Sequence, residues 1–211
     1  MGNFFYSDNV FTRFMSRVFD LILLNVLWVI TSIPIITIGA STTALYTICF
    51  QMHEDQNRGI VIPYFLAFKE NFLKSTALWL IILAFGAASV YNIFLCLSLN
   101  DAIHNLTAVF VIFLMMSLFL FIYAFPLQSR FENKIRYTLL NALFLSLRYL
   151  PRSLLMTAMF IFPVALMFVN LNWFMDVGIF WFVLYFAAVA YLSTLLLKKV
   201  FTFLMSKDED G

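Results

Sequence analysis

The sequence predicts an all-α polytopic membrane protein, a bundle of transmembrane helices that forms one membrane domain over residues 1–211. Hydrophobic residues make up 64% of the 211 residues and charged residues only 11%. A typical soluble domain is about 45–50% apolar and about 25% charged. A soluble fold of this size could not bury so much apolar surface, because it must still present a wetted exterior.

Four runs are long enough to cross a bilayer, since a spanning helix needs about 20 mostly apolar residues. They are Ser75–Ser98, His104–Pro126, Ser153–Asn170 and Asp176–Leu197. The earlier stretch from Val18 to Met52 would measure about 52 Å as one helix at about 1.5 Å per residue, which exceeds a hydrocarbon core of about 30 Å. Pro34 and Gly39 interrupt it. We therefore predict two crossings here, residues 18–37 and 40–53. The second is short, so a re-entrant segment is the alternative.

The distribution of positive charge predicts the topology. All 13 Lys and Arg residues lie before the first crossing, between the second and third, between the fourth and fifth, or after the sixth. The other connections carry none, so the positive-inside rule gives six crossings with both termini cytoplasmic. The expected location is the bacterial cell membrane, as a multi-pass protein. Trp79 is expected near the inner boundary and the connection near Ile38 at the outer face.

Two segments between the spans are amphipathic and are expected on the cytoplasmic side. In residues 63–74, Phe65, Phe68 and Phe72 share one helical face. In residues 130–152, an apolar stripe of Leu139, Ala142, Leu143 and Ser146 is bracketed by basic residues, and Pro151 is expected to end the helix. The candidates for contact with lipid or a partner are Phe65, Phe68, Phe72, Arg130, Phe131, Arg136, Arg148 and Arg152. Such a helix either lies on anionic lipid or fills a groove in another protein.

The sequence offers no catalytic, metal-binding or cofactor-binding set, so we expect no enzyme and no cofactor. The middle of each span lacks an ionisable residue, which argues against an ion-coupled carrier. His53, Glu54 and Asp55 could bind a metal, but a solvated loop is the favoured interpretation. A net charge of +2 excludes a nucleic-acid partner. Cys49 and Cys96 are expected to be free thiols, because the topology separates them beyond disulfide reach.

The most distinctive run is PIITIGASTTALY, residues 34–46. Pro34 and Gly39 break the helix, and neighbouring hydroxyls can satisfy the backbone groups that lipid cannot. The run either packs a tight hairpin or lines a substrate site, as broken helices do in some transporters.

This run, together with YFLAFKENFLKSTALWL at 64–80 and the segment 123–155, resembles the YesL-like family of bacterial integral membrane proteins, domain of unknown function 624. The resemblance covers most of the chain. It implies that signature positions include Pro34, Thr37, Gly39, Ala40, Thr43 and Ala44, with no catalytic residue. It also implies a genomic association with carbohydrate ABC importers, because members are commonly encoded beside them.

Three functions are compatible with these features. The first is a non-catalytic accessory subunit of a carbohydrate ABC importer. This subunit would contact membrane lipids and the permease subunits, and the associated ATPase is a further candidate partner. The second is an independent small transporter or flippase with its site at the Pro34–Gly39 break. The third is a membrane partner of a sugar-responsive sensor. The sequence favours the first and gives no substrate, partner identity or oligomeric state.

Overall fold

The computed structural model describes residues 10–54, 59–98, 106–169, 178 and 181–209. These residues form helices and short connections without a β-strand, which confirms the all-α fold class. In chain order the elements are α1 (Val10–Ser32), the 3₁₀ turn η1 (Ile35–Thr37), α2 (Ile38–His53), α3 (Val61–Ser98), α4 (Thr107–Arg130), α5 (Ile135–Arg148), α6 (Leu150–Val169), the π-helical turn η3 (Trp181–Tyr185) and α9 (Phe186–Glu209).

Four segments of the described chain have the length and composition that membrane crossing requires: Thr12–Ser32, Ile35–His53, Val61–Ser98 and Thr107–Arg130. Two shorter apolar helices follow, Leu150–Pro163 and Val183–Lys198. Their order along the chain is that of the predicted spans, and a helical membrane bundle is confirmed. Residues 170–177, where the predicted spans 153–170 and 176–197 meet, lie outside the described residues.

The boundary between the amphipathic segment 63–74 and the span 75–98 is absent, because both belong to the single helix α3 of 38 residues. No Gly or Pro occurs between residues 64 and 85, so nothing in the backbone ends the helix there. At about 1.5 Å per residue, α3 is about 57 Å long and exceeds a hydrocarbon core of about 30 Å. The second amphipathic segment does form a separate helix, α5, and Pro151 lies in the first turn of α6.

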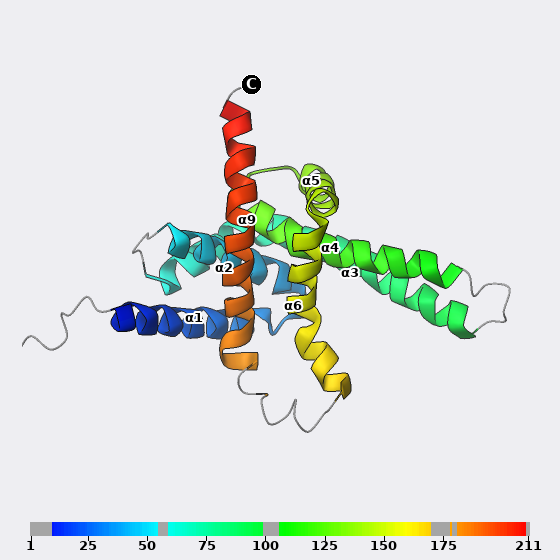
Figure 1. Ribbon diagram of the computed structural model, residues 1–211, viewed down its shortest axis with the longest axis horizontal. Coiled ribbons are helices and arrows are strands. Elements are labelled where there is room, and N and C mark those ends of the chain that lie inside the picture. The colour runs from blue at the N-terminus through cyan, green and yellow to red at the C-terminus, as the bar shows by residue number, and fades with distance from the viewer. Residues whose placement is uncertain (1–9, 55–58, 99–105, 170–177, 179–180, 210–211) are drawn as a thin grey trace, which may run out of the picture.

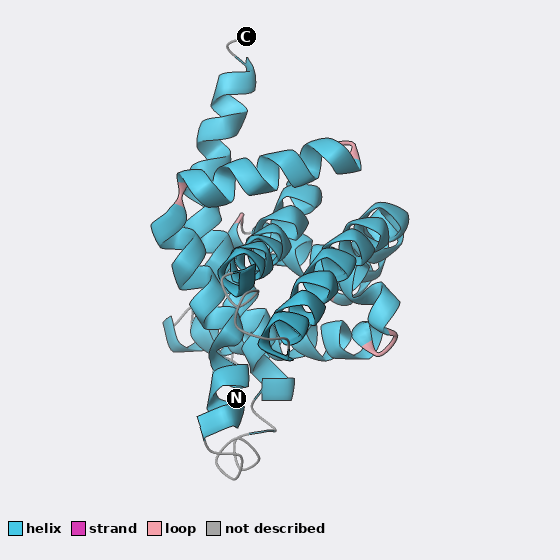
Figure 2. Cartoon of the chain, turned by 90° about the vertical axis from the view of Figure 1, so that its right-hand side faces the viewer, coloured by secondary structure: helices cyan, strands magenta, loops and turns pink. Residues whose placement is uncertain are grey.

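α2 is the central helix of the molecule. Twelve of its 16 residues are buried, and it contacts α1, α3, α4 and α9. Figure 1 shows α3 and α4 side by side as a long hairpin that projects beyond the other helices. α6 runs across this hairpin, and α9 runs across α1 and α2. Figure 2 shows α5 lengthwise over the upper part of the molecule, where Figure 1 shows it end-on.

The end of the α1–α2 hairpin meets α3 partway along its length. The Trp79 indole donates a hydrogen bond to Ile35 O at 2.8 Å. The expectation that Trp79 and the connection near Ile38 lie at opposite membrane faces was therefore wrong. Charge distribution alone cannot report depth within a helix as long as α3, because only the helix ends are constrained by the positive-inside rule. From Trp79, α3 continues for 19 residues, about 28 Å, to Ser98.

Candidate functional site: the helix break and the groove beside it

The break between α1 and α2 has its backbone groups satisfied locally. α1 ends at Ser32, because the residue before a proline is disfavoured in helical geometry and Pro34 follows. Thr37 Oγ1 lies 2.6 Å from Thr31 O and 2.7 Å from Pro34 O, two acceptors that the break releases. Trp79 supplies the donor for Ile35 O. Side chains thus replace the water that an apolar environment lacks.

Gly39 lies at a close contact between α2 and α3. A Cβ atom built on Gly39 would lie 2.2 Å from Ser75 O and 2.7 Å from Trp79 Cβ. Only glycine allows these two backbones to touch. One turn later, Thr43 Oγ1 donates to Ser75 Oγ at 2.8 Å, in a buried contact. The crossing therefore combines small residues with a hydroxyl pair, as helix interfaces in membranes commonly do.

Aromatic side chains tie the same region to both neighbouring helices. The Tyr64 hydroxyl of α3 lies 2.7 Å from Thr31 Oγ1 of α1, and either oxygen can be the donor. Trp28 of α1 donates through its indole N–H to Thr42 Oγ1 at 3.2 Å. The α1–α2 hairpin is consequently fixed both to itself and to α3.

The structure brings most of the signature positions together. Thr37 satisfies the turn, Gly39 touches α3, Thr43 bonds to Ser75, and Ala40 and Ala44 are fully buried. Pro34 is exposed at the turn itself. This arrangement is closed at Gly39, where not even a methyl group fits. The contacts of these residues hold helices together.

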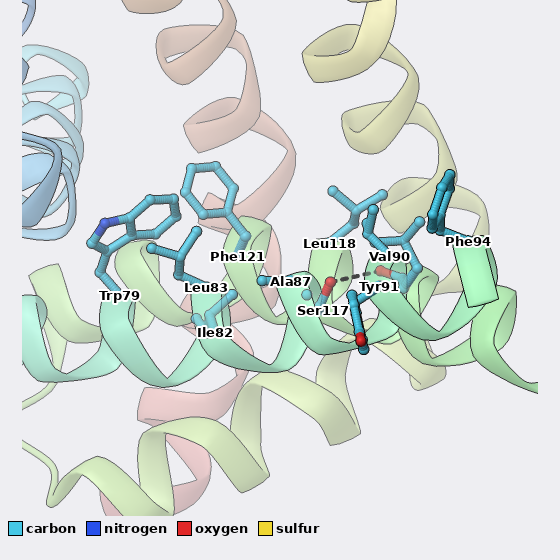
Figure 3. A pocket seen from close by; sticks show the side chains of 12 residues that line it. Trp79, Ile82, Leu83, Ala87, Val90, Tyr91, Phe94, Ser117, Leu118 and Phe121 are labelled. Carbon is cyan, nitrogen blue, oxygen red and sulfur yellow. Dashed lines mark hydrogen bonds between the residues drawn. The ribbon is translucent and has the colours of Figure 1, made fainter.

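A groove on the α3–α4 hairpin begins beside the break. It has a volume of about 800 Å³. Figure 3 shows Trp79 and Phe121 at one end and Phe94 at the other. Its lining is almost wholly apolar: Trp79, Ile82, Leu83, Gly86, Ala87, Val90, Tyr91, Phe94, Leu114, Ser117, Leu118 and Phe121. Ser117 Oγ donates to Leu114 O at 2.8 Å, so its proton is already used. The groove favours an apolar occupant.

A polar junction surrounds the C-terminal end of α2. Arg17 of α1 donates to Met52 O at 2.7 Å, and Lys198 of α9 donates to His53 O at 3.3 Å. Glu54 forms an ion pair with Arg130 of α4. Carbonyls at a helix C-terminus have no partner within the helix and carry partial negative charge, so cations stabilise them. Three helices meet at this end through basic side chains.

The interpretation of residues 53–55 as a solvated loop was wrong for the first two. The His53 ring stacks on Tyr191 with centroids 4.0 Å apart. His53 Nε2 lies 2.8 Å from Thr194 Oγ1 and 3.1 Å from Tyr191 O. Sequence spacing could not show this contact, because α9 lies about 140 residues away along the chain. Asp55 lies outside the described residues.

The candidate contact residues divide into two groups. Three of the aromatic side chains turn inward or pair with each other: Phe131 packs on Phe201, and Phe68 packs edge-on against Phe72. Arg130 lies over the Phe50 ring at 5.1 Å and Arg152 over the Tyr149 ring at 5.2 Å. The exposed members are Phe65, Arg136 and Arg148.

Sequence reasoning missed Asn25, which is fully buried in α1. Its side-chain oxygen accepts a hydrogen bond from Ala187 N at 2.8 Å, where η3 passes into α9. The sequence does contain a signal for Asn25, since a lone amide side chain within an apolar span commonly bonds across helices. Both cysteines are free and buried, as expected.

Comparison with known families adds one match. Residues 21–93 match a family model described as "Protein of unknown function, DUF624", which confirms the YesL-like resemblance over that segment. The match begins in α1 and ends in α3, so it contains the break, Gly39 and both of its α3 contacts. No curated protein and no solved structure matches the chain.

Proposed function

From the match of residues 21–93 to the DUF624 family, we propose that this chain is a non-catalytic membrane subunit that packs against helices of a partner membrane protein. The proposed partner is the permease of a carbohydrate ABC importer. The partner class rests on the family resemblance, and the mode of contact rests on the α3–α4 hairpin.

The groove on this hairpin supports the proposal most strongly. It extends from Trp79 to Phe94, which is 15 residues or about 22 Å along α3. That length equals about four turns of a second helix. The small residues Gly86 and Ala87 line the middle of the groove. Small residues at such a position let another helix approach closely. The occupant that we propose is a transmembrane helix of the permease.

The closed geometry of the break favours this function over an independent transporter. A substrate site at Pro34–Gly39 would need open space with polar groups facing it. Gly39 instead contacts the α3 backbone, and Thr37 and Thr43 bond within the protein. These contacts hold the α1–α2 hairpin against α3, so the break stabilises the position of the α3–α4 hairpin.

Co-purification tests the proposal. The tagged chain is expressed with the two permease subunits of a carbohydrate importer, extracted in mild detergent, and the permease recovered is quantified. Val90→Trp fills the groove from an exposed position. We expect it to lower permease recovery at least about fivefold, which corresponds to about 1 kcal/mol.

The matched control is Leu80→Trp, which adds the same side chain at an exposed position of α3 outside the groove lining. It should leave recovery unchanged. Equal recovery for both variants would show that the groove is not the contact. Absence of permease from the wild-type sample, together with substrate flux in vesicles containing the chain alone, would favour a transporter instead.

A further inference from the structure

Helix α5 has two apolar faces, and only one of them packs against the protein. Thr138, Ala142, Leu145 and Ser146 are buried. On the opposite side, Tyr137, Leu140, Phe144 and Leu147 are each between 52 and 62% exposed. The stripe expected from the sequence therefore faces inward, and a second stripe that the sequence analysis did not identify faces outward.

The outward side chains form one continuous stripe. They recur at intervals of three or four residues, which places them on one side of a helix. At about 100° per residue, Arg136 falls beside Leu147 on one edge of the stripe and Arg148 falls beside Tyr137 on the other. Both arginines are exposed. An apolar strip with a cation on each edge is the pattern of a helix that lies in a membrane interface.

Hydrogen bonds on the buried side fix the rotation of α5. Ser153 Oγ of α6 donates to Ser146 O at 2.7 Å, and Tyr123 of α4 lies 3.0 Å from the same hydroxyl. Thr138 Oγ1 donates to Gln128 Oε1 at 3.4 Å. Rolling α5 so that its exposed stripe faced inward would break its bonds to Ser153 and Gln128.

The charge of this region selects the occupant. Residues 134–152 contain Lys134, Arg136, Arg148 and Arg152 and no acidic residue. We propose that the outward face of α5 lies in the headgroup layer of an anionic leaflet, with Leu140 and Phe144 directed towards the acyl chains and Arg136 and Arg148 bound to lipid phosphates. Each basic residue near such a surface contributes about 1 kcal/mol.

The neighbouring helix supports a lipid occupant. α6 begins two residues after α5 ends. Leu150, Leu154 and Leu155 of α6 are also exposed, by 43 to 52%. The exposed apolar surface therefore continues from α5 into a helix predicted to cross the bilayer. This inference does not depend on the permease and stands or falls separately from the proposed function.

The test uses the full chain in nanodiscs of phosphatidylcholine with or without about 30% phosphatidylglycerol. Phe144→Cys carries an environment-sensitive fluorophore, in a background with Cys49 and Cys96 replaced by alanine. We expect brominated lipid to quench the probe at position 144 at least about twofold more than at the control position Lys134→Cys, with the larger effect in anionic discs. Arg136→Gln combined with Arg148→Gln should remove the dependence on anionic lipid.

Two outcomes would overturn the proposal. Equal quenching of both positions by aqueous iodide would place the α5 stripe in water. Protection of position 144 from both quenchers, increasing with the number of chains per disc, would show that a second copy of the chain covers the stripe. Thermal unfolding of each labelled variant establishes that the fold is intact before either result is interpreted.

Discussion

At the scale of single residues, Gly39 decides how closely α2 and α3 can pack. Gly39→Ala would place a methyl group 2.2 Å from Ser75 O, and backbone cannot give way as a flexible side chain can. We expect a loss of about 1–3 kcal/mol, typical of overpacked cores, seen as a lower unfolding temperature in detergent. Gly178→Ala is the control, because no atom of the described residues lies within 4 Å of its added Cβ. Equal unfolding temperatures for the two variants would contradict the close crossing.

Asn25 carries a second prediction at this scale. Its buried side chain accepts from Ala187 N. Asn25→Leu would leave that amide without this acceptor inside an apolar environment. A buried unsatisfied donor costs about 1–3 kcal/mol, so thermal stability should fall. Asn92→Leu provides the comparison, since Asn92 donates to Ala88 O of its own helix and is more exposed. A larger effect at Asn92 would refute the bridging role of Asn25.

The residues of the break could be predicted from sequence, but their partners could not. Pro34 and Gly39 are recognisable locally, because both have restricted or special backbone requirements. Ser75 and Trp79, which complete the site, lie 36 or more residues away and carry no pattern that identifies their role. Pairing between helices depends on the crossing position, which hydrophobic periodicity leaves open.

At the scale of helices, the C-terminal end of α2 is held by an ion pair between Glu54 and Arg130. Arg130 also lies over the Phe50 ring. Arg130→Gln should therefore destabilise the protein by more than the ion pair alone contributes. The two side chains are about a quarter exposed, so a double-mutant cycle in chemical unfolding should give a coupling energy of about 0.5–1 kcal/mol. Strict additivity would show that the pair contributes nothing.

The continuity of α3 leads to a prediction about depth. The break meets α3 at Trp79, about 28 Å before the helix ends at Ser98. Ile36 and Ser98 should thus lie at different levels relative to the bilayer. A membrane-impermeant thiol reagent added from outside should label Ser98→Cys and leave Ile36→Cys unlabelled in intact cells. Both side chains are exposed in the protein, and both should react after detergent extraction. Labelling of both in intact cells would require the break to reach the outer surface.

At the scale of the whole molecule, sequence predicted the class of fold and the order of the apolar helices, but not their packing. Apolar composition and the length of an apolar run are visible in the sequence itself, as in α4, and they were enough to predict the helices. The central position of α2 was not predicted, since its small and hydroxylic residues resemble a weak span when considered alone. Burial among α1, α3, α4 and α9 explains them, because small residues let four helices approach one.

His53 couples this central helix to α9, and its removal should loosen α9 selectively. His53→Ala removes the stacking on Tyr191 and the contact with Thr194. Local opening that becomes easier by about 1–2 kcal/mol corresponds to an increase of about 5–30-fold in the open population. Hydrogen exchange should accelerate by that factor around residues 191–198. The α3–α4 hairpin should keep its wild-type exchange, because Ser75 and Trp79 bond to Thr43 and Ile35, and these contacts do not pass through His53.

Thr194→Val separates the two contributions, since it deletes the hydroxyl and retains the aromatic stack. An intermediate acceleration of exchange in α9 is expected for this variant. Faster exchange throughout the chain of His53→Ala would mean that the entire fold depends on this contact. Unchanged exchange in α9 would mean that Asn25, bonded to Ala187, and Tyr185, bonded to Met159 O, hold the helix without it. The pattern along α9 therefore distinguishes a local coupling from a global one.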